Sequence, residues 1–557
     1  MMVVTLENAA GRLPDTMAMG EARDRDFNVL TIGKELLERS GGRLVMRFDL
    51  PIRDLHGSWY CEAYRGPGTG LAWNFQVRSA QQYGIPYWTG FNLQQRNTAT
   101  VALSCCRDDV RIEGNMDQMR CVYHFTVTVA VVPETEPFQL LYSTAPKPWP
   151  ELLAAWRKLV LPHGVPNFPD AAFLPVYCTW YAMHGAMTEA ALDRNAELAA
   201  DLGFGTFIVD DGWSYPEAKR ACPETLAEGW YRDIGNWTVA EEKLPDFKKH
   251  VAYAQSLGLK YLLWAAPLFV GRASAEFQRA KSDWEREISL HEWDEVAVFD
   301  PESRGALQAL RRLETLMREL ELDGLKLDFL DFVPRSVDKP RGRSCERYFR
   351  KLTAALRAVK PDALIEFRQN YATPQMLEFA TQFRAADVPF DFLSNFARLI
   401  QIRMMLGDGV PCHADPVFFH PEETAENVSH HMIAALAGVP MLSMELAALT
   451  DEQRAVIRNW LNFYRVNLAV FRSGHWTMRF DRGEPVFLAA ETPEQAIVFV
   501  AQKHCLEEIS ADFAGRRLTA LNLTGETLAL PGGRACDCRG AATGGDAAPV
   551  GGRVERE

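Results

Sequence analysis

The run Asp323-Gly324-Leu325-Lys326-Leu327-Asp328-Phe329 indicates a buried strand that carries two charges. Side chains alternate along a strand, so Leu325, Leu327 and Phe329 can face one way while Lys326 and Asp328 face the other. Buried charges are costly without a purpose, so this pair indicates a functional strand end. If Asp328 is a nucleophile, a second carboxylate must lie elsewhere in the chain.

Strand candidates alternate with helical stretches on both sides of this run. The eight candidates are 173–181, 206–213, 260–267, 324–331, 363–370, 383–390, 410–417 and 439–446. Eight strand–helix units predict a (β/α)₈ barrel. The stretch 295–299 is one strand too many, and we interpret it as an insertion before the fourth strand.

One helix after the first strand can be placed closely. Thr188 is suited to cap its start, and Gly203 is suited to end it. The apolar positions between them fall on one face, as expected for a helix that covers a sheet. They are Leu192, Ala196, Ala199 and Leu202.

The flanking segments have a different character, which predicts a multidomain chain. Residues 1–145 carry short β-branched and aromatic runs typical of an antiparallel β-sandwich. A proline-rich linker is predicted over 146–172. The barrel then covers 173–467, and a small C-terminal antiparallel β-domain covers 468–540. The glycine- and alanine-rich end, 541–557, is expected to be a flexible tail.

Composition excludes several classes of partner. The 557 residues include 60 lysines and arginines and 73 aspartates and glutamates, a formal charge of −13 that disfavours nucleic-acid binding. No window approaches the roughly 20 apolar residues of a membrane span. Eleven scattered cysteines and a start without a signal-peptide pattern predict a cytoplasmic protein with reduced thiols. No cofactor is implied, and the oligomeric state, including a homo-oligomer, stays open.

Polar and aromatic residues end the predicted strands, where a barrel of this kind builds its active site. Carboxylates accept hydrogen bonds from hydroxyl groups, and indole faces pack on sugar rings, so this rim suits a carbohydrate. The candidates are Trp180, Asp210, Asp211, Trp213, Trp264, Lys326, Asp328, Glu366, Arg368, Arg384, Asp387 and His413.

Ordinary structural roles compete with a functional role for single strand-end residues. One aspartate at a strand end is more often a helix cap or a loop anchor, and we assign Asp331 and Asp391 to that class. His413, Asp415 and His420 raise the question of a metal site, but no metal-binding motif accompanies them. The coincidence of several carboxylates on one predicted rim favours a functional site.

Retaining glycosidases need two carboxyl groups about 5–5.5 Å apart. Asp328 and Asp387 end the fourth and sixth strands, so both can reach one glycosidic bond. The acid must stay protonated near neutrality, which calls for a less polar setting or a nearby negative charge. The nucleophile must be ionised, and Lys326 favours that form.

Four segments in this order resemble glycoside hydrolase clan D, and within it family 36, whose type activity is α-galactosidase. They are Ile208-Val209-Asp210-Asp211-Gly212-Trp213, Gly235-Asn236-Trp237 with Lys243-Leu244-Pro245, Leu325-Lys326-Leu327-Asp328, and Arg384-Ala385-Ala386-Asp387-Val388. The resemblance implies Asp328 as nucleophile, Asp387 as acid/base, and sugar contacts from Asp210, Asp211 and Lys326.

The chain also departs from the family. Leu327 stands where the family usually has a tryptophan, and Ala265 follows Trp264 where an acidic residue is usual. The fifth strand reads Ile365-Glu366-Phe367-Arg368-Gln369-Asn370, whereas the family usually brings a cysteine and glycines there. Glu366 and Arg368 are therefore predicted to change the contacts at the sugar 2-position, or to recognise an acidic or amidated substituent.

We therefore expect a retaining exo-α-glycosidase, an α-galactosidase first of all, that acts on a small or oligomeric sugar. The alternatives within the clan are an α-N-acetylgalactosaminidase, an α-glucosidase or a transglycosylase. An alternative from another class is a catalytically silent carbohydrate-binding protein, and a metal-dependent hydrolase is more distant.

Overall fold

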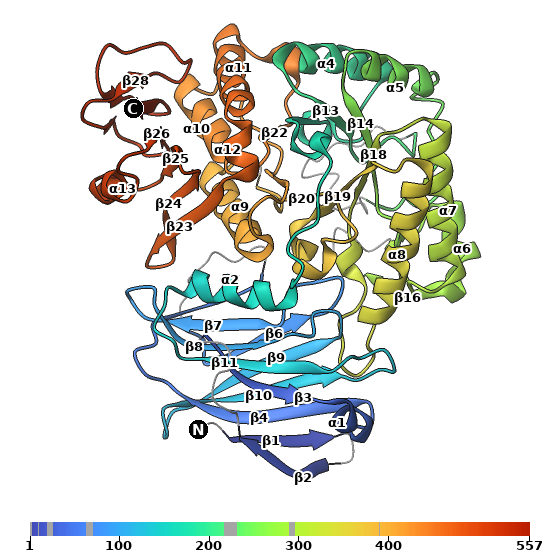
Figure 1. Ribbon diagram of the computed structural model, residues 1–557. Coiled ribbons are helices and arrows are strands. Elements are labelled where there is room, and N and C mark those ends of the chain that lie inside the picture. Colours follow the sequence, from blue (N-terminus) through green and yellow to red (C-terminus); the bar gives the residue numbers. More distant parts are fainter. Residues whose placement is uncertain are drawn as a thin grey trace.

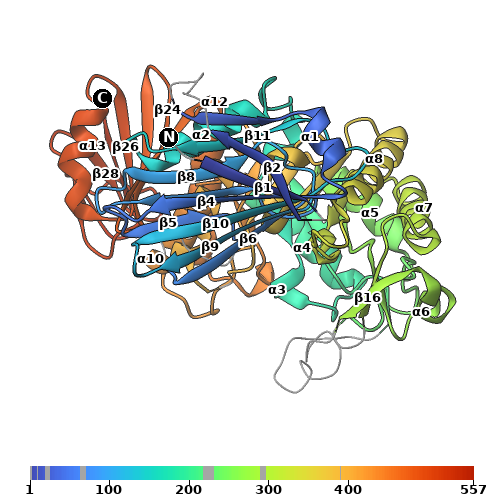
Figure 2. The ribbon, with the colours of Figure 1, turned by 90° about the horizontal axis from the view of Figure 1, so that it is seen from below.

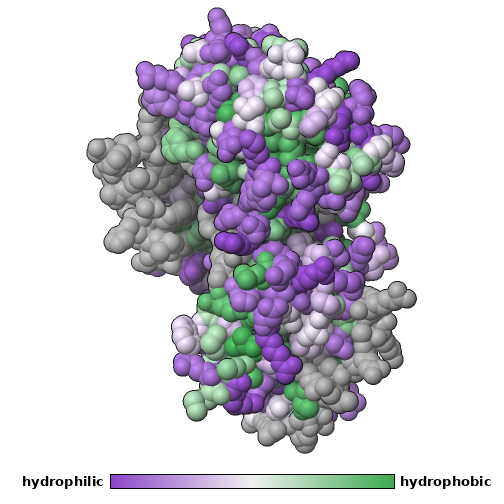
Figure 3. Space-filling model, turned by 90° about the vertical axis from the view of Figure 1, so that its left-hand side faces the viewer, coloured by the Kyte–Doolittle hydropathy of each residue, from purple (hydrophilic) through white to green (hydrophobic). Residues whose placement is uncertain are grey.

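The computed structural model describes residues 3–8, 11–18, 26–62, 71–216, 231–288, 296–388 and 390–557. The chain forms an N-terminal pair of β-sheets, a central barrel and a C-terminal sheet, in that order (Figure 1). Seen from below, the C-terminal sheet lies at one side of the molecule and strand β16 (Trp284–Ile288) at the other (Figure 2). Hydrophilic side chains cover much of the face shown in Figure 3, with hydrophobic ones between them.

The N-terminal part is a sandwich of two antiparallel sheets, as predicted. One sheet has the order β2-β1-β4-β10-β9-β6 and the other β3-β11-β8-β7-β5. Aromatic side chains fill the space between them, and Phe48 stacks on Phe125 with ring centres 5.4 Å apart. The bounds are β1 (Val3–Asn8), β2 (Gly11–Ala18), β3 (Asn28–Ile32), β4 (Arg43–Pro51), β5 (Gly57–Tyr60), β6 (Asn74–Ser79), β7 (Tyr87–Phe91), β8 (Asn97–Leu103), β9 (Val110–Asp117), β10 (Val122–Ala130) and β11 (Phe138–Ser143), with α1 (Lys34–Arg39).

The central part contains eight parallel strands, and each overlaps one of the predicted segments, with β20 beginning one residue before its segment. They are β12 (Val176–Cys178), β13 (Thr206–Val209), β14 (Lys260–Ala265), β18 (Gly324–Leu327), β19 (Leu364–Arg368), β20 (Gln382–Arg384), β21 (Cys412–His413) and β22 (Met441–Leu442). Between the last two, the Ala414 amide donates to the Val439 carbonyl at 3.0 Å and the Val417 amide to Met441 at 2.8 Å. These bonds close the sheet into the predicted barrel.

Helices surround the barrel (Figure 1). In α4 the Thr188 hydroxyl accepts a hydrogen bond from the Ala191 amide at 3.3 Å, and Gly203 ends the helix with a φ of 103°. The predicted cap, buried face and stop are thus confirmed. The bounds are α3 (Trp180–Met183), α4 (Glu189–Leu202), α5 (Phe247–Ser256), α7 (Arg304–Glu319), α8 (Gly342–Val359), α9 (Phe392–Leu406), α10 (Ala425–Ala435), α11 (Asp451–Val466) and α12 (Leu468–Ser473).

The extra strand before β18 belongs to a separate small sheet. Strand β17 (Val296–Phe299) pairs with β15 (Phe269–Gly271) and β16 in an antiparallel, three-stranded arrangement. Helix α6 (Ala275–Arg279) lies in the same insertion. Our interpretation of this stretch as an insertion is therefore confirmed, and residue 295 lies outside the described part of the chain.

The predicted linker is helical in its middle. Helix α2 (Trp149–Val160) begins with proline in its first turn, where the missing N–H costs nothing. The buried Trp156 indole donates to the Leu103 carbonyl of β8 at 2.9 Å, and Arg157 donates to the Met404 carbonyl of α9 at 2.5 Å. This segment connects the sandwich to the barrel helices through a helix that its proline content does not predict.

The C-terminal sheet has the order β23-β24-β25-β26-β30-β28. Its pairs are antiparallel except β25 with β26, which the crossover helix α13 (Leu506–Asp512) joins in parallel. The bounds are β23 (His475–Asp481), β24 (Glu484–Glu491), β25 (Gln495–Val500), β26 (Arg517–Asn522), β27 (Leu528–Ala529), β28 (Arg534–Cys536), β29 (Ala547–Ala548) and β30 (Arg553–Arg556).

The expected flexible tail over 541–557 contains two of these strands. Strand β30 pairs with β26 and β28, and Val554 is fully buried between neighbours. Composition mispredicts this end because backbone pairing inside a sheet does not need apolar side chains at every position. Among the described helices none is long and apolar enough to cross a membrane.

Candidate active site

A pocket of about 170 Å³ lies at the C-terminal ends of the barrel strands. It is lined by Trp180, Asp210, Tyr231, Trp264, Lys326, Asp328, Phe329, Arg368, Arg384, Asp387 and Pro416. Eight of these eleven residues are predicted site residues, which the barrel brings together from its strands and their following loops. The remaining predicted residues, Asp211, Trp213, Glu366 and His413, do not line the pocket.

Asp328 stands immediately after β18 in a turn with unusual backbone geometry. The next residue, Phe329, has a φ of 58°, a left-handed conformation uncommon for a bulky side chain. Through this turn the Phe329 amide donates to Asp328 Oδ1 at 2.8 Å. The Trp264 indole donates to Oδ2 at 3.2 Å. The carboxylate is thus fixed in orientation at the base of the pocket.

Charge around Asp328 favours its ionised form. Burial alone raises the pKa of a carboxyl group, but the positive charges of Arg368, Arg384 and Lys326 outweigh burial and lower the pKa of Asp328. Asp328 is 5% exposed, so these charges act with little screening by water. An ionised, oriented carboxylate is what a nucleophile requires.

Asp387 follows β20 and lines the same pocket as Asp328. Its Oδ1 accepts a hydrogen bond from Arg384 Nη1 at 3.0 Å, and its Oδ2 contacts Arg368 Nη2. The side chain lies deep in the protein yet is 42% exposed, because it faces the open pocket. Burial opposes ionisation, but the two arginines outweigh it and lower the pKa of Asp387.

This environment differs from the setting expected for a general acid. A general acid needs a raised pKa, whereas two guanidinium groups hold Asp387 in its ionised form. A neighbouring carboxyl group with a raised pKa is instead Asp415, which is buried behind Arg384. Any acid role for Asp387 therefore requires a change around Arg368 or Arg384.

Arg368 connects the two carboxylates. Its Nη1 lies 3.4 Å from Asp328 Oδ1, and its Nη2 contacts Asp387 Oδ2. The side chain is 10% exposed and its guanidinium centre is 5.6 Å from the Phe329 ring centre. One guanidinium therefore spans the gap between Asp328 and Asp387, which places both within reach of one small ligand.

Lys326 and Asp210 form an ion pair in the pocket wall. Lys326 Nζ contacts Asp210 Oδ2, which also accepts from the Cys178 thiol at 3.2 Å. Burial lowers the pKa of a lysine, but Asp210 together with the nearby Cys178 and Glu366 outweighs burial and raises the pKa of Lys326. Both side chains are almost completely buried, so the pair can present fixed polar atoms to a ligand.

Asp211 and Trp213 lie behind the pocket wall. Asp211 Oδ2 accepts from the Tyr215 hydroxyl at 3.1 Å, and the Trp213 indole donates to the Trp264 carbonyl at 2.9 Å. Gly212 between them has a φ of 121°, and a Cβ there would lie 2.5 Å from the Gly185 Cα. Glycine is therefore required for the turn that orients the acidic pair.

Glu366 and His413 lie beneath the pocket and are almost completely buried. His413 Nδ1 is 3.1 Å from Glu366 Oε2, and its Nε2 is 2.8 Å from the Ala172 carbonyl oxygen. Glu366 also accepts from the Gln382 amide at 3.0 Å. Glu366 is two residues before Arg368 on the same face of β19, so it occupies the layer below the pocket.

Two further residues complete the site and were not among the predicted ones. Tyr231 lines the pocket beside Trp264, with ring centres 6.1 Å apart. Asp415 contacts Arg384 Nη1 and accepts from the Val388 amide at 2.7 Å and the Tyr181 hydroxyl at 3.2 Å. Asp415 thereby holds Arg384 against Asp387. The acidic end of the seventh strand was a usable signal for Asp415, whereas a lone tyrosine gives none.

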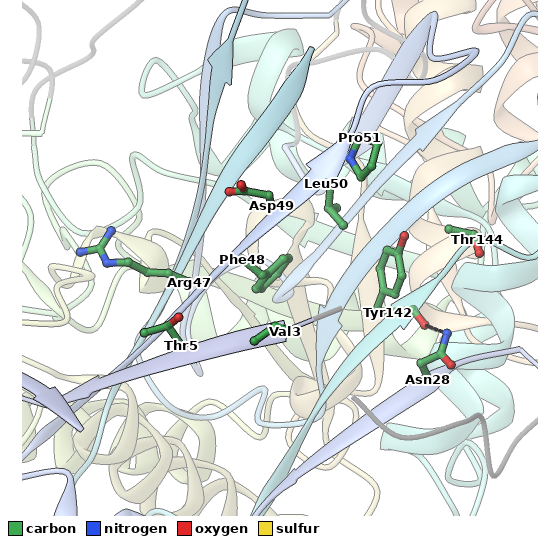
Figure 4. A pocket seen from close by; sticks show the side chains of 10 residues that line it. All are labelled: Val3, Thr5, Asn28, Arg47, Phe48, Asp49, Leu50, Pro51, Tyr142 and Thr144. Carbon is green, nitrogen blue, oxygen red and sulfur yellow. Dashed lines mark hydrogen bonds between the residues drawn. The ribbon is translucent and has the colours of Figure 1, made fainter. Parts of the chain in front are cut away.

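Neither a metal cluster nor the larger cavity competes with this pocket. Among the described residues no group of three or more histidine, cysteine, aspartate or glutamate side chains is arranged to hold a metal ion. A cavity of about 780 Å³ opens in the N-terminal sheets beside Arg47, Phe48 and Tyr142 (Figure 4). Among the described residues that line it, Asp49 is the single carboxylate, and Asp49 pairs with Arg120 and His124.

Sequence comparisons point to one family. The melibiase family model matches residues 164–297. The α-galactosidase of Escherichia coli is 29% identical over 120 residues, which cover 21% of this chain and 15% of that enzyme. The α-galactosidase AgaA of Geobacillus stearothermophilus is 29% identical over 106 residues, 19% of this chain and 13% of that enzyme. These alignments span only a small part of the relatives' length.

Solved structures share most of the fold. AgaA of Geobacillus stearothermophilus, a family 36 enzyme, aligns with a TM-score of 0.63 at 14% identity over 87% of this chain and 78% of that chain. The α-galactosidase of Lactobacillus brevis aligns with a TM-score of 0.62 at 14% identity. The alignment covers 88% of this chain and 77% of that chain. The α-galactosidase of Thermus thermophilus aligns with a TM-score of 0.58 at 15% identity. The alignment covers 82% of this chain and 92% of that chain. These likenesses confirm the predicted fold, and the sequence matches agree with the family resemblance.

Proposed function

We propose that this chain, a relative of the melibiase-type α-galactosidases of glycoside hydrolase family 36, is a retaining exo-α-glycosidase that acts first of all on terminal α-galactosides. The observation that carries the proposal is the pair of carboxylates, Asp328 and Asp387, which line one small pocket and both contact the Arg368 guanidinium. Solved relatives bind raffinose, stachyose and p-nitrophenyl α-galactoside, which supports a galactoside as substrate.

The proposed reaction has two displacements. Asp328 attacks the anomeric carbon, and the bond to the leaving oxygen breaks while Asp387 gives that oxygen its proton. In the second step Asp387 removes a proton from water, and the water oxygen replaces Asp328 at the anomeric carbon. The sugar leaves with its original α configuration, and both carboxyl groups return to their starting protonation states.

The wall residues supply orientation. Lys326 and Asp210 offer a fixed donor and acceptor for sugar hydroxyls. Trp180, Trp264 and Tyr231 offer aromatic faces for the C–H groups of the ring. A pocket of about 170 Å³ has room for one monosaccharide unit, which favours exo action on a terminal sugar.

Product stereochemistry tests the proposal. Wild-type protein with an aryl α-galactoside should release α-galactose first, followed by slow mutarotation, as seen by proton NMR. In Asp328→Ala, azide should restore turnover and give a β-galactosyl azide. Release of β-galactose by the wild type would contradict the retaining mechanism, and near-normal turnover by Asp328→Ala without azide would contradict the assignment of the nucleophile.

A second candidate is a catalytically silent carbohydrate-binding protein. The contacts of Asp387 with Arg368 and Arg384 favour it, because they oppose protonation of the proposed acid. Its expected signature is binding of galactose in calorimetry with no hydrolysis of an aryl α-galactoside over days. Turnover that disappears in Asp328→Asn would exclude it.

A further inference from the structure

Arg368 occupies a position in the pocket that is unusual for a purely structural arginine. Its two terminal nitrogens reach both Asp328 and Asp387, the carboxylates between which the scissile bond must lie in the proposed reaction. A neutral sugar offers hydroxyl groups to this fork. An anionic group matches it better, because a guanidinium binds carboxylate and sulfate oxygens with two parallel hydrogen bonds.

The charges of the lining residues support an anionic ligand. Lys326, Arg368 and Arg384 line the pocket together with Asp210, Asp328 and Asp387. When Asp387 carries the proton that the acid step needs, three cations face two carboxylates. Lys326 then remains paired with Asp210, and Arg384 with the buried Asp415. Arg368 keeps Asp328 beside its Nη1 at 3.4 Å, but the Nη2 side of its guanidinium then faces a neutral carboxyl group instead of a charged one.

We propose that the glycone of the natural substrate carries an anionic substituent, a carboxylate or a sulfate, and that Arg368 is the residue that selects it. This inference rests on the proposed glycosidase function. The substituent takes the place of Asp387 on the Arg368 fork and leaves Asp387 with Arg384.

The exchange also gives the substrate a role in preparing the acid. In the free protein Arg368 helps to keep Asp387 ionised. An anion on the guanidinium neutralises that charge and adds a negative charge near Asp387, and both changes favour the protonated acid. A neutral galactoside leaves the Arg368–Asp387 pair in place. Recognition and acid catalysis are thereby coupled through one side chain.

The test compares matched substrates. Kinetics are measured with 4-nitrophenyl α-galactoside, its 2-sulfate, its 6-sulfate and the corresponding α-galacturonide. At least one anionic substrate should have a kcat/KM about 10-fold or more above that of the neutral galactoside. In Arg368→Met the ratio of anionic to neutral kcat/KM should fall by about 100-fold, the scale expected when one partner of a buried charge pair is removed.

Two further variants make the test specific. Arg368→Lys keeps the charge but loses the planar fork, and we expect its ratio to fall at least about 10-fold. If Arg368→Met fails to fold, Arg368→Lys takes its place as the test of the inference. Arg311→Met removes an exposed arginine of α7 and should leave the ratio unchanged. The three anionic substrates, with charge at position 2 or position 6, show which anionic group and which ring position fit the pocket.

Binding separates this inference from the proposed function. Calorimetry with galacturonate, galactose 2-sulfate, galactose 6-sulfate and galactose reports recognition without turnover. If the protein hydrolyses the neutral galactoside and Arg368→Met leaves the ratio of anionic to neutral kcat/KM unchanged, the inference is overturned and the proposed glycosidase function stands. Arg368-dependent binding of an anionic sugar without any Asp328-dependent turnover would overturn the function and keep the recognition. Neither binding nor turnover would overturn both.

Discussion

Two aspartates lie at opposite ends of β18, and the chain uses them differently. Asp323, before the strand, accepts hydrogen bonds from Lys360 at 2.6 Å, the Tyr261 amide at 2.9 Å and Gln255 at 3.0 Å. Asp328, after the strand, accepts hydrogen bonds from the Trp264 indole and the Phe329 amide and lies beside the guanidinium of Arg368. Both side chains are nearly inaccessible to water.

The difference lies in where the compensating charges are placed. The lysines around Asp323 are 30–40% exposed and hold it at the closed base of the barrel. The cations around Asp328 line a pocket that also contains a second carboxylate. The base of a barrel contributes to stability and the C-terminal rim to chemistry. Substitutions at the two ends should therefore separate stability from activity.

The largest effect is expected at the rim. Asp328→Asn removes the proposed nucleophile while it preserves shape, so turnover of an aryl α-galactoside should fall by at least about 10⁴-fold. The melting temperature should change little. Initial-rate kinetics together with circular dichroism check both statements. If activity is lost only in proportion to the loss of folded protein, Asp328 affects stability as Asp323 does, and the two ends of the strand do not differ in role.

A smaller loss of activity is expected at Asp387. Asp387→Ala removes the proposed general acid, which contributes roughly 10²–10⁴-fold. The loss should be greatest for poor leaving groups and small for an activated aryl group such as 2,4-dinitrophenyl. A series of aryl galactosides measured with wild type and variant reveals this dependence. An equal loss for every leaving group would contradict the acid role.

At the base of the barrel the expected effect is on stability. Asp323→Asn leaves Lys360 and Lys260 without their carboxylate, so the unfolding free energy should fall by about 2–3 kcal/mol. The kcat of folded protein should stay within about twofold of wild type. Urea unfolding and active-site titration measure the two quantities. A loss of activity per folded molecule would place Asp323 in the catalytic machinery.

The smallest effect is on the pH dependence of stability. Burial opposes ionisation, but Lys360 and the hydrogen bonds from the Tyr261 amide and Gln255 together outweigh burial, and the pKa of Asp323 is lowered in the folded state. A lowered folded-state pKa gives stability that is present above the unfolded value of about 3.9 and is lost as the pH falls through the folded value. The stability difference between wild type and Asp323→Asn should therefore shrink from pH 7 to about pH 3 in urea unfolding.

Much of the fold follows from local patterns. The eight barrel strands lie where alternating strand and helix segments predict them, and Thr188 and Gly203 bound α4 as expected. Two features were not predicted, the helix at 149–160 and the strand pairing at 553–556. Both depend on partners far away in sequence, and neither proline content nor glycine content contains that information.

The sequence predicted most of the charged residues that line the pocket, but not which of them contact each other. Strand-end position identifies Asp328, Asp387 and Arg368 as rim residues. It does not reveal that Glu366 lies one layer too low to line the pocket, or that Asp415 holds Arg384. Tyr231 enters from a loop with no strand-end signal. These features depend on depth along the strands and on loop paths.

The sequence by itself determined the class of fold and the set of charged strand ends, because side-chain alternation and helix caps are properties of neighbouring residues. Only the tertiary structure decided which charges meet. Arg368, Asp387 and Asp415 come from three successive strands, and the stagger of those strands brings one guanidinium between Asp328 and Asp387. The charge at the end of β18 thus acquires its partners from barrel closure, which no local pattern encodes.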